Sequence, residues 1–440
     1  MNWLLVLFLL ILIYALVAYV IREKGIWKDH ITFYGPILGL KTARVGFFDR
    51  FMRWSTVLRI YGTVGVAAVV VVTAIGTVML VVALFFTYQT CPEPTGIYAP
   101  QNILLLPGIN DFVPSTFAVW FAFVLTIAIH EFGHGILCRV EQVRVRAMGV
   151  LIAVIPIGFF VEPDEEELEK AQPAPKSRIF GAGITNNLVV GFLCMGLLLL
   201  ALGPVTATPD PIIYGVYQGY PAQEAGVPQN SFLRTVGGQD VHSVEEVAAL
   251  MNQTRPGDQV TIGVEKDGVL ETYGLTLAAW PQNVSDSPSG FMGVTYYPGK
   301  DVAASMHQLD RPAGLLYLMV LPFDLGGYLH LLAFESPEQA FFQVPFAGYW
   351  GVIQLLFWSA WINVNVGIFN ALPMVPLDGG YIMKEGIHSF LRRRGQEAYT
   401  DRIVVLFSTV ILAMILAIIS VPYLCRLPQV LALVFPMFLP

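Results

Sequence analysis

The sequence predicts a polytopic α-helical membrane protein with about six transmembrane helices, a re-entrant β-hairpin and one inserted small β-rich domain. The chain of 440 residues is 55% hydrophobic and only 13% charged, which makes it more apolar than a typical soluble chain. Long runs almost without charge recur, and each is able to cross about 30 Å of hydrocarbon. Between the fourth and fifth runs the composition changes to that of a soluble module.

Six apolar runs account for the predicted membrane spans. They are residues 3–21, 65–88, 115–138, 184–202, 346–372 and 403–420. The first run has no basic start and no small-residue cleavage site, so we interpret it as a retained helix. Two further apolar stretches, 150–161 and 314–325, are too short or too interrupted by Gly and Pro to cross. We expect them to be re-entrant or interfacial.

Loop charge predicts the orientation in the membrane. Residues 22–61 carry eight Lys or Arg against three Asp or Glu, and short basic loops of this kind stay in the cytoplasm. The N-terminus is therefore expected outside, with 139–178 and 384–402 inside and 204–343 outside. The formal net charge of −7 indicates no nucleic-acid partner.

The insert shows the local patterns of a small folded module. Val260, Ile262 and Val264 alternate before the turn at 266–268, which predicts a β-hairpin. Ser243 followed by Glu246 forms a capping box that starts a helix over 244–251. These patterns divide the chain into an N-terminal membrane region (1–204), an extracytoplasmic domain (205–300) and a C-terminal membrane region (301–440).

The third predicted span contains the most specific chemical motif, an H-E-x-x-H at His130, Glu131 and His134. Residues four apart share one face of a helix, so both imidazoles can bind one zinc ion while Glu131 reaches a water on that metal. Ionisable side chains near the centre of a lipid-embedded helix cost roughly 2.5 kcal/mol or more each. A functional metal site explains them better than polar residues lining a metal-free vestibule.

A catalytic zinc needs a third protein ligand and one open position. Two carboxylates come into question: Asp324, with His330 nearby, and Asp378. The crossing count places Asp324 on the outer side, whereas Asp378 follows a span that descends to the inner side, where His130 lies. We therefore predict Asp378 as the third ligand, with a helix cap as its alternative role.

These residues together resemble the site-2 protease family of intramembrane metalloproteases. The resemblance rests on the membrane H-E-x-x-H, on the N-x-x-P-x-x-P-L-D-G-G of residues 370–380, and on the outer insert. It implies zinc bound by His130, His134 and Asp378, with Glu131 as general base. It also implies that transmembrane protein substrates are cut in or beside the lipid bilayer, near its cytoplasmic side.

The resemblance extends to three further elements. The insert is similar to a PDZ domain, which implies a peptide partner; the alternative is a spacer that shapes access. Residues 148–163 resemble the family's membrane-embedded β-hairpin, whose edge pairs with unwound substrate; the alternative is a plain packing element. The family's A-G-P-x-x-N element matches residues 182–187, with Ile184 in place of proline. It implies that Asn187 holds the substrate strand or the oxyanion, with Asn186 or a helix-interface hydrogen bond as alternatives.

Two other classes of function remain as alternatives. One is another membrane-bound zincin that processes lipidated or signal-like peptides, and the other is a non-enzymatic receptor or transporter with a structural metal. A glutamate third ligand would favour the first, and a closed fourth ligand would favour the second. Cys91 and Cys425 both fall on the outer side, and the sequence leaves open whether they pair.

Overall fold

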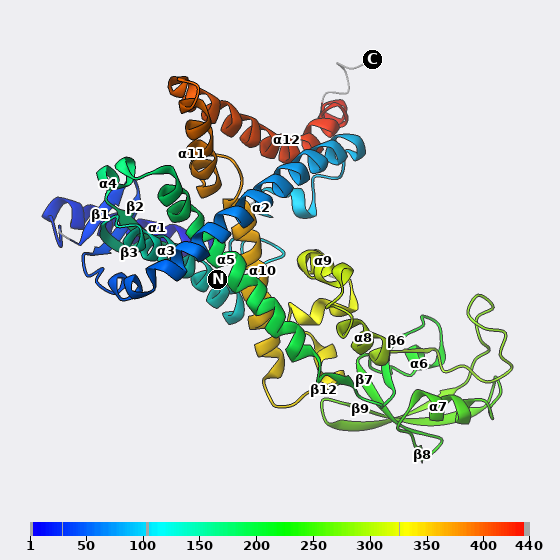
Figure 1. The fold of residues 1–440 in the computed structure, drawn as a ribbon. Helices are drawn as coiled ribbons and strands as arrows, with labels where there is room; N and C mark the ends of the chain where they lie inside the picture. The colour runs from blue at the N-terminus through cyan, green and yellow to red at the C-terminus, as the bar shows by residue number, and fades with distance from the viewer. Residues whose placement is uncertain (1–2, 29, 103–104, 325, 435–440) are drawn as a thin grey trace. The chain divides into compact units, whose positions relative to one another are not determined.

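The computed structural model describes residues 3–28, 30–102, 105–324 and 326–434. The chain divides into two compact units, the first formed by Met1–Gly196 with Leu355–Pro440 and the second by Leu197–Gln354. The first unit is mostly helical, and the second contains a β-sheet (Figure 1).

Long helices form most of the first unit. They are α1 (Trp3–Lys24), α2 (Ser55–Thr90), α3 (Phe117–Val140), α5 (Pro173–Leu202), α10 (Tyr349–Asn370), α11 (Asp378–Arg392) and α12 (Thr400–Val434), with α5 ending and α10 beginning in the second unit. Shorter helical segments are η1 (Phe48–Trp54), η2 (Gly96–Tyr98), η3 (Pro100–Asn102), α4 (Glu165–Lys170) and η7 (Glu397–Tyr399).

Among the described residues, five helices are long and apolar enough to cross a membrane. They are Phe48–Thr90, Phe117–Val140, Pro173–Leu202, Tyr349–Asn370 and Glu397–Arg426. Each coincides with one of the predicted runs, so a multi-pass membrane protein is confirmed. The run 3–21 lies within helix α1, and its role as a sixth span stays a prediction.

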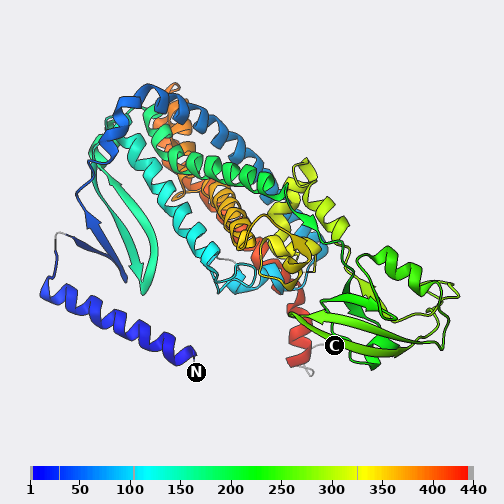
Figure 2. The same ribbon diagram turned by 90° about the horizontal axis from the view of Figure 1, so that it is seen from below.

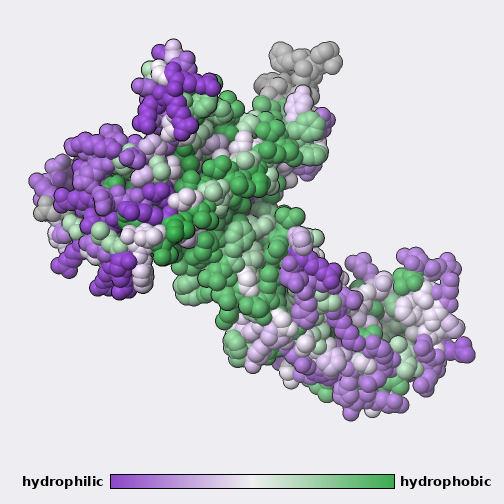
Figure 3. Space-filling view, viewed as in Figure 1, coloured by the Kyte–Doolittle hydropathy of each residue, from purple (hydrophilic) through white to green (hydrophobic). Residues whose placement is uncertain are grey.

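The outer surface of these helices is apolar, as a lipid-facing surface requires. On α2, Val70, Ile75 and Val78 are each more than half exposed. Figure 3 shows continuous hydrophobic surface along α2, and hydrophilic surface around α4 and over the end of α11. The apolar surface of α2 and the hydrophilic surface around α4 thus lie in different regions of this unit.

Four antiparallel strands form the sheet of the first unit, in the order β1-β2-β3-β4. Their bounds are β1 (Ile31–Tyr34), β2 (Ile37–Thr42), β3 (Val145–Ala153) and β4 (Ile155–Pro163). Residues 148–163 thus lie in a two-stranded hairpin, whose strands Figure 2 shows as long arrows. Strand β4 is an edge strand and packs along α3. Entry of the hairpin into the membrane stays a prediction.

The second unit contains a sheet with the order β10-β9-β7-β6-β11 and a separate pair of strands, β12 and β5. The strands are β5 (Thr206–Ala207), β6 (Ile212–Val216), β7 (Ser231–Val236), β8 (Gln239–Asp240), β9 (Gln259–Lys266), β10 (Val269–Thr276), β11 (Val294–Tyr296) and β12 (Phe342–Gln343). The helical segments are α6 (Pro221–Glu224), α7 (Val244–Met251), α8 (Gly299–Met306), α9 (Pro312–Val320), η4 (Leu321–Phe323), η5 (Tyr328–Leu332) and η6 (Pro337–Phe341).

Local patterns in the second unit are confirmed. Strands β9 and β10 pair across a turn in which Asp267 and Gly268 have φ of 51° and 79°, as a tight hairpin turn requires. Helix α7 begins after Ser243, whose hydroxyl accepts a 3.2 Å hydrogen bond from the backbone N–H of Glu246. The second compact unit, Leu197–Gln354, is longer than the predicted domain 205–300 at both ends. The domain boundaries drawn from the sequence stay a prediction.

A disulfide in the first unit joins two segments that are far apart in sequence. Cys91, which follows α2, is bonded to Cys425 in α12, 334 residues later. The other two cysteines, Cys138 and Cys194, are free. The structure therefore pairs the two cysteines whose partnership the sequence left open.

Candidate metal centre and active site

Helix α3 supplies the two histidines. It begins after Thr116, whose hydroxyl accepts a hydrogen bond from the backbone N–H of Val119, a standard N-cap. One helical turn separates His130 and His134, so their side chains share one face. The centroids of the two rings lie 4.8 Å apart.

Asp378, about 250 residues later in the chain, lies next to the two histidines. It is the first residue of α11, and the N-cap is Leu377, so capping is not the role of the aspartate. Its Oδ2 lies 3.0 Å from Nε2 of His130 and 3.3 Å from Nε2 of His134. The segment between α10 and α11 leaves the helical path because Pro373 and Pro376 lack the N–H that a helix interior uses.

The donor set fits zinc. The three ligand atoms all lie within 4.8 Å of one another. Ligands at about 2.0–2.1 Å from a tetrahedral zinc lie roughly 3.3 Å apart, which is close to both nitrogen–oxygen distances given above. Two imidazole nitrogens and one carboxylate leave one coordination position open, as catalytic sites require. Among the described residues this is the one group of three His, Cys, Asp or Glu that converges in this way.

The second ring nitrogens of the histidines point away from Asp378 to other partners. Nδ1 of His134 lies 2.8 Å from the backbone oxygen of Ile179, and Nδ1 of His130 lies 3.1 Å from the Asn187 side-chain amide. Metal-bound histidines typically donate the second ring N–H to a carbonyl or carboxylate oxygen, and the Ile179 oxygen is such an acceptor for His134. The contact with the Ile179 carbonyl could not be predicted from the sequence, because every residue type has the same backbone oxygen.

Glu131 is held by the hairpin. Its Oε2 accepts a 3.0 Å hydrogen bond from the backbone N–H of Val161 in β4. The contact connects the glutamate of the H-E-x-x-H to the edge strand of the sheet. This hydrogen bond could not be predicted from the sequence either, because its donor is a backbone N–H.

Helix α5 closes the site on a further side. A Cβ built at Gly183 would lie 2.6 Å from Cε1 and Nε2 of His130 and 2.6 Å from Nε2 of His134, closer than any ordinary contact. Only glycine therefore lets α5 approach the rings. Asn186, also in α5, accepts a hydrogen bond from Tyr61 of α2 and donates one to the backbone oxygen of Ile129 in α3. It therefore connects three helices.

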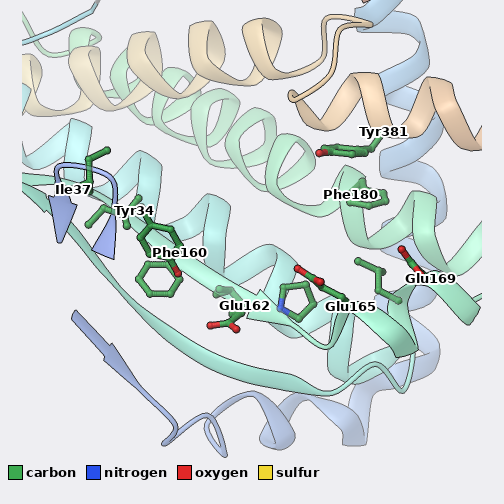
Figure 4. Close-up of a pocket in the computed structure, with 12 residues that line it drawn as sticks. Tyr34, Ile37, Phe160, Glu162, Glu165, Glu169, Phe180 and Tyr381 are labelled. Carbon is green, nitrogen blue, oxygen red and sulfur yellow. The ribbon is translucent and has the colours of Figure 1, made fainter. Parts of the chain in front are cut away.

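A cavity of about 630 Å³ lies beside β4. Aromatic side chains line it from several elements, and three carboxylates lie along it (Figure 4). The lining includes Tyr34, Phe160, Phe180, Tyr381, Glu162, Glu165 and Glu169. Phe180 of α5 stacks on Tyr381 of α11, with centroids 4.8 Å apart. Val161 also lines the cavity, which therefore reaches the strand that binds Glu131.

The other candidate ligands are engaged elsewhere. Oδ2 of Asp324 accepts a 2.6 Å hydrogen bond from the Tyr317 hydroxyl, and Nδ1 of His330 lies 2.8 Å from the Gly327 oxygen. Neither belongs to the converging group of His130, His134 and Asp378.

A bundle of apolar helices that brings two imidazoles, one carboxylate and a neighbouring glutamate together defines a membrane-bound metallopeptidase. The model of peptidase family M50 matches residues 118–417, most of the chain. The chain belongs to this family, which confirms the resemblance to site-2 proteases.

Relatives match this chain over different lengths. An uncharacterised protein of Methanocaldococcus jannaschii is 21% identical over 397 residues, covering 88% of this chain and 89% of that protein. The zinc metalloprotease RasP of Shouchella clausii is 26% identical over 219 residues, 48% of this chain and 51% of its own length. The chain therefore spans about half the length of the second relative.

One solved structure also shows a partial likeness. The PDZ domain of an SdrC-like protein from Listeria monocytogenes aligns with 22% of this chain and 93% of its own, at 17% identity and a TM-score of 0.19. A TM-score this low does not assign a fold.

Proposed function

We propose that this chain is an intramembrane zinc metalloprotease that hydrolyses peptide bonds of transmembrane proteins in or beside the bilayer. One observation carries the proposal: the ligand atoms of His130, His134 and Asp378 converge, with Glu131 adjacent on the same helix, among apolar membrane helices. A soluble metallopeptidase has no need to place these groups in such helices, where each is costly.

The roles follow from the chemistry of each group. His130, His134 and Asp378 hold zinc, which when bound supplies the Lewis acid that polarises the scissile carbonyl. Glu131 removes a proton from the attacking water and gives it to the leaving amine. The water oxygen first adds to the carbonyl carbon, and the carbon–nitrogen bond then breaks as the amine nitrogen takes the proton from Glu131. No covalent enzyme intermediate is needed.

Strand β4 is the proposed docking edge for the substrate. A peptide bond inside a helix is shielded by its own hydrogen bonds, so the substrate has to unwind before it is cut. An edge strand offers replacement partners for the freed backbone groups. The cavity beside β4 supplies space for substrate side chains next to Val161, whose N–H already meets Glu131.

Loop charge supports a cytoplasmic position for the site. The basic segments 22–61 and 384–402 belong inside by the positive-inside rule, and His130 and His134 lie towards the C-terminal end of α3, which leads to the inner loop 139–178. The second unit then faces the extracytoplasmic side. The disulfide between Cys91 and Cys425 supports this arrangement, because disulfides persist on the oxidising side of a membrane.

The second unit is proposed to act as a PDZ-like peptide-binding module. Strand β11 ends its sheet, and an apolar groove lies between it and α7, lined by Val247, Met251, Phe291 and Met292 among others. A strand edge beside a helix is the usual place for an extended peptide. The alternative role, a spacer that shapes access to the site, predicts no peptide affinity.

The competing functions make different predictions for zinc. A structural metal in a receptor or transporter has four protein ligands, whereas the described residues here converge as three. Another membrane zincin is expected to use a glutamate third ligand, whereas this site uses Asp378.

The decisive experiment compares cleavage of a membrane-embedded model substrate by wild type, Glu131→Gln and Glu166→Gln, with bound zinc quantified in all three. Glu166 is an exposed residue of α4 paired with Lys170, so its variant controls for the substitution itself. We expect Glu131→Gln to keep zinc and lose about 10²–10⁴-fold in rate. Equal cleavage by all three proteins would remove Glu131 as the base, and a wild type without zinc would remove the metal site.

A further inference from the structure

The two histidines of the metal centre differ in what holds their second ring nitrogen. A neutral imidazole carries one proton, and a metal takes the nitrogen without it. Both Nε2 atoms face Asp378 Oδ2, so both Nδ1 atoms have to carry the proton when zinc is bound. Each Nδ1–H then needs an acceptor.

His134 has such an acceptor in the backbone oxygen of Ile179, at 2.8 Å. For His130 the neighbouring group is the Asn187 side chain, with Nδ2 placed 3.1 Å from Nδ1. Two N–H groups facing each other would repel. The zinc-bound tautomer of His130 is therefore incompatible with this orientation of the amide.

The side chain of Asn187, for its part, has an acceptor without a donor. It is 0% exposed, and its Oδ1 is buried without a hydrogen-bond partner. A buried acceptor left unpaired destabilises the folded protein. The two ends of a carboxamide have nearly the same shape, so a half-turn of the amide places Oδ1 against Nδ1–H of His130. One rotation satisfies both groups.

We propose that Asn187 is a positioning residue for zinc, whose Oδ1 accepts the Nδ1–H of His130 and so presents the Nε2 lone pair to the metal. The inference rests on the proposed zinc site. It gives Asn187 a different role from contact with the substrate or the oxyanion. Asn187 does not line the cavity beside β4, and its burial keeps the amide from a bound peptide.

The packing of α5 supports this role. Gly183 lies one turn before Asn187 and faces both rings, so this side of α5 lies against the metal centre. On the α10 side, a Cβ built at Gly367 would lie 3.5 Å from Cβ of Asn187. The side chain is therefore confined between α3 and α10, which suits a group that has to hold a ring in one orientation.

The test measures zinc affinity of the full-length purified chain by chelator competition, for wild type, Asn187→Leu, Asn187→Asp and Asn363→Leu. Asn363 is the matched control, because it is also 0% exposed and has an unpartnered Oδ1, but donates to the Ser359 oxygen rather than meeting His130. Thermal unfolding of the zinc-free proteins reports the structural cost of each change separately.

Removal of an outer partner of a metal ligand lowers affinity about 10–100-fold, and we expect that loss for Asn187→Leu alone. Asn187→Asp keeps an acceptor for Nδ1–H and should bind zinc at least as tightly as wild type. A merely structural asparagine predicts the reverse order, because a buried carboxylate costs more than leucine.

The outcomes separate this inference from the proposed function. Wild-type affinity in Asn187→Leu, or equal losses in Asn187→Leu and Asn363→Leu, overturns the positioning role while the zinc site stands. A wild-type chain that binds no zinc overturns both. If Asn187→Asp does not fold, the comparison of Asn187→Leu with Asn363→Leu still decides the question.

Discussion

The backbone N–H of Val161 donates a 3.0 Å hydrogen bond to Oε2 of Glu131. This contact joins the proposed general base to the edge strand that is proposed to receive the substrate. The hairpin therefore holds the proposed base in place and also forms the proposed docking edge. Such a backbone contact is testable because proline removes the donor without removing the strand.

Val161→Pro is expected to slow cleavage while zinc binding is retained. The N–H of Val161 points to Glu131 rather than into the β3 ladder, and proline is tolerated at such edge positions. A hydrogen bond to a charged group contributes about 1.5–3 kcal/mol, so the rate should fall roughly 10- to 100-fold. Val161→Ala keeps the donor and serves as control; equal rates for both variants would show that the contact does not orient the base.

Asp378→Asn is expected to release zinc, because the change removes the one anionic ligand of the centre. Asp324→Asn is the matched control, since Asp324 is the other carboxylate that the sequence offered and its Oδ2 is bonded to Tyr317. Zinc affinity by chelator competition should fall more than about 100-fold in the first variant, beyond the effect of an outer-shell partner. Retention of zinc by Asp378→Asn and its loss from Asp324→Asn would reverse the ligand assignment.

Gly183→Ala is expected to lower zinc content and activity together. The added methyl would lie 2.6 Å from Nε2 of both His130 and His134, so the rings have to move. Gly196→Ala in the same helix meets nothing within 4 Å and should leave both quantities unchanged, while helix propensity adds up to about 1 kcal/mol of stability. Metal analysis and unfolding of both variants check this, and unchanged zinc in Gly183→Ala would contradict the tight approach of α5.

Thiol counting under denaturing conditions checks the disulfide. With Cys91 bonded to Cys425 and Cys138 and Cys194 free, a maleimide should label two thiols before reduction and four after it. Cys91→Ser releases Cys425, so that variant should show three thiols without reductant. Four reactive thiols in the unreduced wild type would mean that the pair does not form in the purified protein.

Much of this protein was predictable from local sequence. Long uncharged runs determine membrane helices because the bilayer demands continuous apolar length. The spacing of His130 and His134 determines a shared helix face, and Ser243 with Glu246 determines the start of α7, because both relations act within one turn. Asp378 was also predicted, because the order of crossings limits which carboxylates reach the depth of the histidines.

Only the tertiary structure decided which partners complete the site. The Ile179 oxygen and the Val161 N–H belong to the backbone. Almost every residue type has these backbone groups, so the sequence does not show which of them will contact the site. The contact of Asn187 with His130 and the pairing of Cys91 with Cys425 depend on how helices pack. Periodicity determines the face that a helix buries, whereas the register between two packed helices is set by the side chains of both together.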